Sequence, residues 1–536
     1  MPKTPPTWIP AGDSAVETAM RHGASRRDLL RMLAAGGLSL SAAGAVLGQA
    51  RPAMAAPTKG GHLKIAGFTG STADTLDPAR SSNSTDYTRC VALYDRLTSL
   101  DEKSAVVMEL AEAIDTTDAK VWTIKLRRGV TFHDGRKLTT ADVIYTLKRH
   151  LDPATGSKVA SIAKQMADFK AIDDNTMEIT LVSPNADLPT IFALQHFLIV
   201  ANGTTDFAKG NGTGPFILET FEPGVKSLMR RNDSYWKTGG GPYVDSFEQF
   251  AIADDTARVN ALLSGDVHIA AAINPRSMRQ VEGKPGFTIV KSLSNSYNDI
   301  NFRLDMSPGD KADFVLGMKS LVNREAMLRS ALRGQGALGN DQPVFPGNPL
   351  RNDDLKPRAF DPDKAKFYFN KSGMVGQTIP ITASDAVGSS VDMAMILQSD
   401  AASAGLKIDV QRVPSDGYWD KFWLKAPVFF GNNNYRPTPD ILFSTFYAST
   451  APWNESRYKS EKFDQMLVEA RGLLDQAKRK EMYGVMQTMV SEDAGTIIPA
   501  YNYGIDAMTA KLKGMGQKPQ GGLSGYTAPV EVWFES

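Results

Sequence analysis

The chain has 536 residues, with 60 lysines and arginines against 59 aspartates and glutamates, so its formal net charge at pH 7 is +1. This balance gives no indication of the strongly basic stripe that nucleic-acid-binding domains need, and the sequence has no polybasic patch for an anionic membrane surface. The single cysteine, Cys90, excludes an intrachain disulfide, and a chain of this length is too long for one hydrophobic core. We therefore expect two or three domains that are stabilised by buried apolar area.

The first 55 residues have the layout of an export signal. The paired arginines Arg26 and Arg27 precede an uncharged stretch at 32–50, and residues 53–55 form a small-x-small cleavage site. The uncharged stretch is rich in glycine, alanine and serine, so it is too weakly apolar for a good membrane span. We therefore predict a periplasmic protein that is exported by the twin-arginine pathway and cleaved near Ala55, and not a membrane-anchored one.

Strand patterns and helix patterns alternate along the rest of the chain. The strands show alternating apolar residues, and many helices begin at a serine, threonine or aspartate. The predicted strands are His62–Ala66, Trp122–Leu126, Thr176–Leu181 and Lys407–Val410. The predicted helices are Ser84–Leu97, a helix from Thr139 or Thr140 through Leu147, Asp255–Leu263, Ser320–Leu332, Asp361–Phe369, Val391–Ala404, Lys462–Leu474 and Ala477–Val490. Helices between strands indicate an α/β or mixed fold.

The common catalytic and cofactor motifs are missing from the sequence. It has no G-x-S-x-G elbow and no phosphate-binding G-x-x-x-x-G-K-[ST] loop, and its histidines after residue 55 are never three or four positions apart. The glycine-rich run 210–214 is followed at once by Pro215, which favours a turn into a strand over a dinucleotide-binding loop. We therefore expect no cofactor, no metal and no enzymatic activity. An exported hydrolase is a remote alternative.

Five short blocks occur in an order that resembles one protein family. They are T-F-H-D-G-R-K-L-T-T-A-D-V at 131–143, G-T-G-P-F at 212–216, R-N-D-S-Y-W at 231–236, A-L-L-S-G-D-V at 261–267 and D-P-D-K-A at 361–365. Each block is weak alone, but together and in this order they are similar to the periplasmic solute-binding proteins of ABC importers. The resemblance is to the peptide and oligopeptide (dipeptide, nickel) binding family 5.

The resemblance implies a fold and a function. The fold is an α/β, two-lobed periplasmic binding protein (Venus-flytrap) with an extra inserted α/β subdomain. By the positions of the blocks, lobe I is expected at 56–88, 213–293 and 503–536, the inserted subdomain at 89–212 and lobe II at 294–502. The implied function is that of a monomer that captures a peptide-like small molecule between its lobes. It would then deliver this solute to the transmembrane permease subunits of an ABC transporter.

One segment departs from the pattern of peptide-binding relatives. They carry a motif similar to W-x-x-D-x-x-D-P, whose first aspartate pairs the α-ammonium of the ligand. Aligned on Pro439, this chain has Asn432 for the tryptophan and Tyr435 for that aspartate. The neighbouring Arg436 is a bidentate donor suited to a carboxylate or phosphate. An oligosaccharide, an opine or another anionic conjugate is therefore an alternative solute.

The candidate ligand-binding residues come from two parts of predicted lobe II. Most are amide or aromatic side chains, which suit the wall of a solute cleft. For the two tryptophans among them, packing in a helix is the alternative, and for the arginine it is a structural ion pair. The candidates are Tyr297, Asn298, Asn301, Trp419, Trp423, Asn433, Asn434, Tyr435, Arg436, Phe443 and Tyr447.

Overall fold

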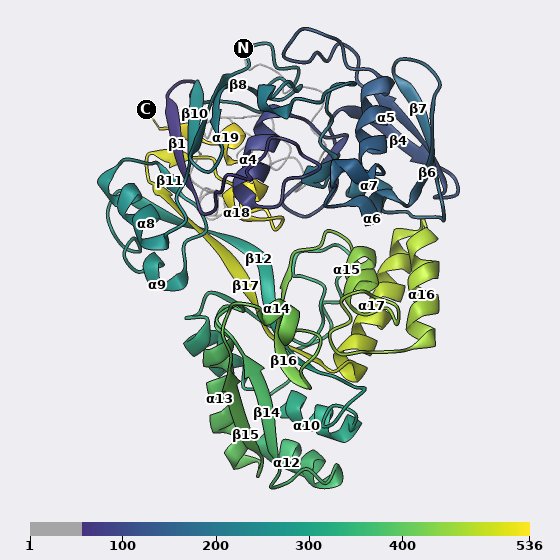
Figure 1. Ribbon diagram of the computed structural model, residues 1–536, viewed down its shortest axis with the longest axis vertical. Coiled ribbons are helices and arrows are strands. Elements are labelled where there is room, and N and C mark those ends of the chain that lie inside the picture. The colour runs from purple at the N-terminus through teal and green to yellow at the C-terminus, as the bar shows by residue number, and fades with distance from the viewer. Residues whose placement is uncertain (1–55, 536) are drawn as a thin grey trace, which may run out of the picture. The chain divides into compact units, whose positions relative to one another are not determined.

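A computed structural model describes residues 56–535, so the export signal that we predict at residues 1–55 lies outside the described part. The chain from Thr58 onward forms one compact unit. Two long strands, β12 (Phe287–Phe302) and β17 (Thr496–Thr509), run side by side through this unit (Figure 1). They are antiparallel and pair along most of their lengths.

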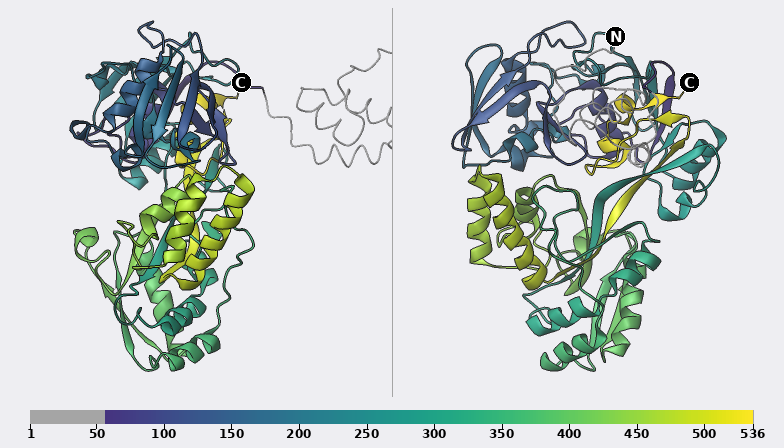
Figure 2. Two further views of the ribbon diagram at one scale, coloured as in Figure 1. Left: turned by 90° about the vertical axis from the view of Figure 1, so that its right-hand side faces the viewer. Right: turned by 180° about the vertical axis from the view of Figure 1, so that it is seen from behind.

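One eleven-stranded sheet is divided by β12 and β17 into two halves. Its order is β15-β14-β16-β12-β17-β11-β1-β10-β9-β8, with β13 also paired to β17. The half in lobe I contains β1 (His62–Gly67), β8 (Phe216–Glu222), β9 (Lys226–Arg231), β10 (Ser246–Ala251) and β11 (Ile269–Ala270). The half in lobe II contains β13 (Gly336–Leu338), β14 (Thr378–Ala383), β15 (Lys407–Arg412) and β16 (Val428–Asn434). Because β12 and β17 belong to both halves, they connect the two lobes (Figure 2).

A separate four-stranded sheet forms the centre of the inserted subdomain. Its order is β4-β5-β7-β6, and all neighbours are antiparallel. The short strands β2 and β3 pair nearby, and β18 pairs with β19 close to the C-terminus. The bounds are β2 (Thr98–Leu100), β3 (Val106–Met108), β4 (Ala111–Thr116), β5 (Val121–Leu126), β6 (Met166–Ala171), β7 (Thr176–Leu181), β18 (Leu512–Lys513) and β19 (Trp533–Phe534).

Helices lie between most of these strands, as expected for an α/β fold. In lobe I and the inserted subdomain they are α4 (Ser84–Leu93), α5 (Thr140–Arg149), α6 (Ala160–Ala163), α7 (Leu188–Ile191), α8 (Asp255–Ser264), α9 (Pro275–Met278), α18 (Gly522–Gly525) and α19 (Ala528–Glu531). In lobe II they are α10 (Ala312–Leu321), α11 (Arg324–Ala326), α12 (Pro362–Lys371), α13 (Ser390–Ser403), α14 (Tyr418–Lys421), α15 (Pro439–Phe446), α16 (Glu461–Gly472) and α17 (Gln476–Asp493). Short 3-10 turns lie at Pro153–Thr155, Gln195–Phe197 and Phe207–Lys209.

Local sequence explains where the helices begin and end. Thr139 and Asp142 form a capping box at the start of α5, which satisfies backbone N–H groups that the helix itself leaves free. Asp361 accepts a hydrogen bond from the Lys364 amide, and Pro362 follows at the first helical position of α12. Helix α8 ends at Gly265, whose φ of +86° is open to glycine. These helix positions agree with the sequence predictions.

Two helix predictions are wrong. The predicted helix Ser84–Leu97 ends at Leu93, because Tyr94 is extended and its N–H caps the last turn. The predicted helix Ser320–Leu332 starts inside α10 and crosses a break at Val322, which is also extended. Asn323 then caps α11 by accepting from the Ala326 amide, and a π-helical stretch at Met327–Ala331 follows. Apolar spacing continues across the break, so periodicity alone could not reveal it.

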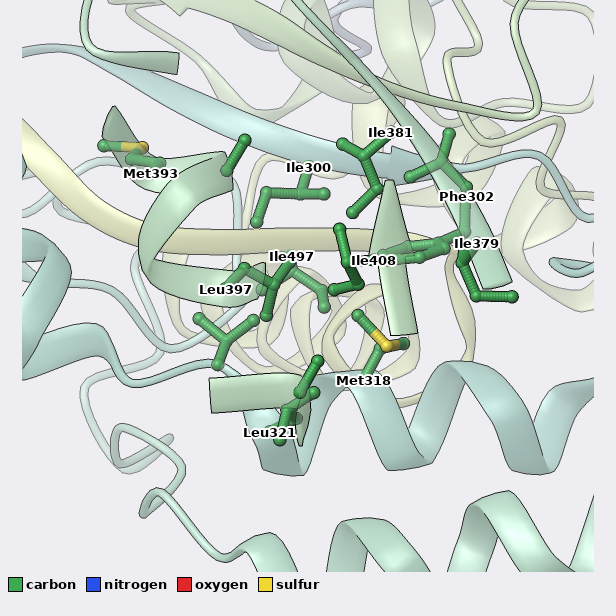
Figure 3. Close-up of a cluster of buried hydrophobic side chains, with 14 of the residues drawn as sticks. Ile300, Phe302, Met318, Leu321, Ile379, Ile381, Met393, Leu397, Ile408 and Ile497 are labelled. Atoms are coloured by element: carbon green, nitrogen blue, oxygen red, sulfur yellow. The ribbon is translucent and has the colours of Figure 1, made fainter. Parts of the chain in front are cut away.

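Lobe II has its own hydrophobic core between its half of the sheet and the helices beside it. Ile300 and Phe302 of β12 meet Ile379 and Ile381 of β14, with Leu397 of α13 (Figure 3). All of these side chains are at most 2% exposed. This core fixes one end of β12, the strand that carries several candidate ligand-binding residues.

The inserted subdomain contacts lobe II directly. Helices α16 and α17 lie below it in Figure 1, and the views in Figure 2 agree. Arg479 of α17 donates to Asp187 over 2.7 Å, and both side chains are buried. The Ala186 amide donates to the Arg471 carbonyl over 2.8 Å. These contacts hold the two parts together.

Candidate functional site

Some candidate residues from each of the two parts lie on adjacent strands. Strand β12 pairs antiparallel with β16, so that Tyr297 faces Asn433 and Asn298 faces Asn432. The Asn432 amide nitrogen donates to Asn298 Oδ1 over 2.7 Å, and Asn298 Nδ2 donates to the Gly388 carbonyl. Because successive residues of a strand point to opposite faces, Asn432 and Asn434 share one face and are exposed. This face presents amide groups to solvent.

The opposite face of the same strands is buried and contains an acidic pair that sequence reasoning missed. Asp299 and Glu455 are 0% and 4% exposed. The Asn433 amide nitrogen donates to both carboxyls, over 3.0 Å to Asp299 and 3.4 Å to Glu455. Trp423 Nε1 donates to Glu455 over 2.6 Å. No simple sequence signal could have revealed this pair, because its members are far apart along the chain.

The acidic pair lies among neutral side chains. Burial, with the neighbouring Glu455 charge, raises the pKa of Asp299 well above its usual range, and burial also raises the pKa of Glu455. Within residues 56–535, no lysine, arginine or histidine lies within ion-pair distance of either carboxyl. Two carboxylates this close and this buried cannot both be ionised at low cost. We therefore treat the pair as holding one proton.

A cavity of about 190 Å³ lies where lobe I, the inserted subdomain and lobe II meet. Lobe II contributes Tyr435 and Pro437 to its wall. The Tyr435 hydroxyl lies 3.0 Å from Ser104 Oγ, in the turn between β2 and β3 of the inserted subdomain. Within the described part of the chain, Tyr435 is the one candidate residue in the lining of the cavity.

Asp95 on the cavity wall explains two of the sequence blocks. Its carboxylate accepts hydrogen bonds from the Tyr235 hydroxyl, Trp236 Nε1 and the Thr213 hydroxyl, each over 2.8 Å. Burial raises the pKa of Asp95 to about 6, although these three donors lower it. The blocks at 212–216 and 231–236 therefore join on one buried carboxylate and build the scaffold beside the cavity.

The charges that line the cavity balance one another. Three are acidic and three are basic: Asp95, Glu109, Glu531, Arg96, Lys237 and Lys518. Lys237 pairs with Glu109 over 2.8 Å, and Lys518 pairs with Glu531 over 2.5 Å. Burial lowers the pKa of Arg96. The charges of Glu109 and Asp95 oppose this lowering but are the smaller effect. The lining itself therefore has no excess charge.

Arg436, directly after Tyr435, has no acidic partner within residues 56–535. Its Nη1 donates only to the carbonyls of Asn434 and Tyr435, over 3.4 and 3.2 Å, and its guanidinium lies over the Phe446 ring at 5.9 Å. Burial lowers the pKa of Arg436, and the titratable groups that oppose this are the hydroxyls of Tyr297 and Tyr87.

The two candidate tryptophans form part of an aromatic row. Trp419 is 42% exposed and meets Trp423 edge to face at 5.6 Å between ring centroids. Trp423 meets Trp453 at 5.8 Å, and Trp453 meets Phe446 at 5.6 Å. The row therefore extends from solvent to the ring beneath Arg436. Its exposure does not fit packing inside a helix core for Trp419.

Four other candidates are buried in the interior of lobe II. Asn301 is 0% exposed and accepts from the Thr496 hydroxyl over 2.8 Å. Phe443 and Tyr447 belong to a core beneath α15, α16 and α17, and Tyr297 packs against Phe345 and Tyr501. None of these four presents surface to a solute in this arrangement. A direct contact of these residues with a ligand stays a prediction that the structure does not support.

Comparison with known proteins decides the family. A model of the family described as bacterial extracellular solute-binding proteins, family 5 (middle), matches residues 105–455. The chain belongs to this family. The resemblance that we drew from the five blocks and the expected two-lobed fold are thereby confirmed.

The matches between this solute-binding protein and its relatives extend over most of this chain and nearly all of each relative. The dipeptide-binding protein of Escherichia coli K12 is 23% identical over 477 residues, which are 80% of this chain and 88% of that protein. Helicobacter pylori DppA, solved with the peptide STSA, matches with a TM-score of 0.72 at 22% identity over 89% and 99% of the two chains. A. tumefaciens AgaA, solved with agropinic acid, matches with a TM-score of 0.71 at 21% identity over 89% and 99%.

The family membership settles the class of activity. Homologues are substrate-binding proteins of ABC transporters and not enzymes, so this chain is a binding protein that works with an ABC permease. Family members are periplasmic. In residues 56–535, no helix is long and apolar enough to cross a membrane. The same residues contain no group of three or more histidine, cysteine or acidic side chains that could hold a metal ion.

Proposed function

We propose that this protein captures a small peptide-like solute in the cavity between its lobes and delivers it to an ABC permease. The observation that carries the proposal is the cavity itself, which is walled by all three parts of the molecule. Its volume of about 190 Å³ lies below the roughly 300–1,000 Å³ of sites for drug-sized ligands. The solute is therefore small, in the range of a short peptide or a compact conjugate.

The contact between Tyr435 and Ser104 supports a closing mechanism. It joins lobe II to the inserted subdomain beside the cavity, so opening the lobes has to break it. A solute that contacts both walls binds the closed arrangement better than the open one and shifts the population toward it. The long strands β12 and β17 connect the lobes and are the elements about which such a hinge motion would turn.

A second candidate is a non-peptide solute such as an opine or another anionic conjugate. The specific observation is that Tyr435 occupies the position of the ammonium-pairing aspartate and its hydroxyl lies within hydrogen-bond distance of Ser104. Asp95, one of the three acids in the cavity lining, already accepts three hydrogen bonds. The names of the relatives, which include peptide binders and an agropinic acid binder, are consistent with either candidate.

Native mass spectrometry of the protein purified from an exporting host tests the proposal. We expect a small solute to co-purify, and a thermal-shift panel of peptides, oligosaccharides and opines to raise the melting temperature for one class only. Tyr435→Phe and Ser104→Ala should each weaken binding, and the double variant should lose no more than either single one. A protein that is empty and indifferent to the whole panel would contradict the proposal.

We also propose export by the twin-arginine pathway with cleavage after Ala55. The support is the paired arginines Arg26 and Arg27 before an uncharged stretch. Replacement of both by lysine should leave the precursor inside the cell, while N-terminal sequencing of the exported wild-type protein should begin at Ala56. Export of the lysine variant at the wild-type rate would contradict this route.

A further inference from the structure

We infer that Arg436 binds a carboxylate of the solute, so that the protein selects anionic solutes. This inference rests on the proposed function, because it assigns the chemistry of one part of the same cleft. It begins from the position of the residue. Arg436 lies between Tyr435 and Pro437, which both line the cavity, and its guanidinium lies 5.9 Å from the centroid of the Phe446 ring.

The charge of Arg436 is not neutralised by the protein. Within the described residues no carboxylate lies within 4 Å of its guanidinium, which donates only to two carbonyls of its own loop. The acidic groups nearest to it are two phenols that stay neutral, because burial raises the pKa of Tyr87 to about 12 and that of Tyr297 well above 10. A partly buried guanidinium without a counter-charge is costly unless an anion reaches it.

Other buried arginines of this protein show the contrast. Arg89 pairs with Asp74 over 2.9 Å, Arg324 with Asp341 over 2.6 Å and Arg479 with Asp187 over 2.7 Å. These are structural ion pairs that need no ligand. Unlike these three arginines, Arg436 has no carboxylate partner within the described residues, and two of the three acids in the cavity lining, Glu109 and Glu531, already pair with Lys237 and Lys518.

The shape of the group also favours a carboxylate. The guanidinium has five donors in a planar fork, and Nη1 alone is used by the backbone carbonyls. The remaining donors are free to bind both oxygens of one carboxylate, the bidentate arrangement that arginine makes best. The Phe446 ring centroid lies 5.9 Å from the guanidinium carbon, within the range of a cation–π contact. The structure therefore assigns Arg436 as the specificity-determining residue of the cleft.

A comparison of matched probes tests this assignment. The probes are a mixed dipeptide library as free acids, the same library as C-terminal amides, and the same acids with acetylated N-termini. Thermal shift identifies the binding members, and calorimetry measures their affinities for wild type, Arg436→Lys and Arg436→Gln. We expect wild type to prefer acids over amides by about 10- to 100-fold, because a hydrogen bond to a charged group is worth that factor. Acetylation should change affinity little, since no acid stands at the Tyr435 position.

The variants separate the role of Arg436 from the function as a whole. Arg436→Gln should abolish the preference for acids, and Arg436→Lys should retain part of it and show a stronger salt dependence. The control is Arg412→Gln, which removes an exposed arginine paired with Asp385 and should leave the preference unchanged. If wild type binds acids and amides equally and Arg436→Gln matches it, the inference is overturned while the proposed function stands. If wild type binds no member of any library, the peptide-like function itself is overturned.

Discussion

Asp299 and Glu455 meet over Gly431, and the three residues come from three separate segments of lobe II. Asp299 faces Gly431 across the β12–β16 pair, and Glu455 reaches the same place from the loop after α15. A Cβ on Gly431 would collide with Asp299 Oδ1 and Glu455 Oε1. The missing side chain is therefore what lets the two carboxyls approach each other.

The acidic pair predicts a pH-dependent stability. Burial raises the pKa of both carboxyls in the folded protein. The shared proton therefore contributes its full stability below the pKa of about 4 that these carboxyls have in the unfolded chain. This contribution is lost as the pH rises through their pKa values in the folded protein. Asp299→Asn keeps a neutral hydrogen-bonding group there. We expect the melting temperature of Asp299→Asn, relative to that of wild type, to rise steadily as the pH is raised from 5 to 9.

Thermal melts across this pH range check the prediction. Asp385→Asn is the control, because Asp385 is exposed and pairs with Arg412 at the surface. Its profile should run parallel to that of wild type, since it does not remove a buried carboxyl. A parallel profile for Asp299→Asn as well would show that the pair does not hold a proton.

Gly431→Ala should destabilise lobe II. The added methyl group has to displace one of two buried carboxyls, and overpacking of this kind costs about 1–3 kcal/mol. Denaturant unfolding measures the loss. Gly240→Ala is the matched control, because a Cβ there meets no atom within 4 Å. Equal stability of both variants would mean that the carboxyls move apart freely.

Breaking the Arg479–Asp187 pair should weaken the contact between the inserted subdomain and lobe II. Both side chains are at most 6% exposed, so Arg479→Ala leaves a buried carboxylate without its partner and should cost about 3–5 kcal/mol. Replacement of both residues by apolar ones, Arg479→Met with Asp187→Leu, should recover much of this loss. Unfolding curves of the single and double variants measure these changes in stability. A double variant that loses the sum of the two single losses would show that Arg479 and Asp187 act independently.

Much of the architecture follows from local sequence. Helix caps and apolar periodicity correctly predicted several elements, because both act over a few residues. Examples are the caps at Thr139, Asp361 and Gly265 and the alternating apolar residues of Thr176–Leu181. The break at Val322 could not be predicted in this way. It depends on the Asn323 cap and on the buried bonds of Lys319 and Arg324, which reach distant parts of the chain.

The sequence by itself indicated the family and the two-lobed α/β fold, and it identified the segments around Tyr297 and Asn433 as candidate ligand-binding segments. Only the tertiary structure decided what these residues do, since it buries Asn301 and Phe443, exposes Trp419 and leaves Arg436 without a counter-charge. The physical reason is that burial and electrostatic pairing join residues far apart in the chain. Asp299 and Glu455, or Asp95 and Tyr235, become partners only when β12, β16 and the cavity wall are assembled.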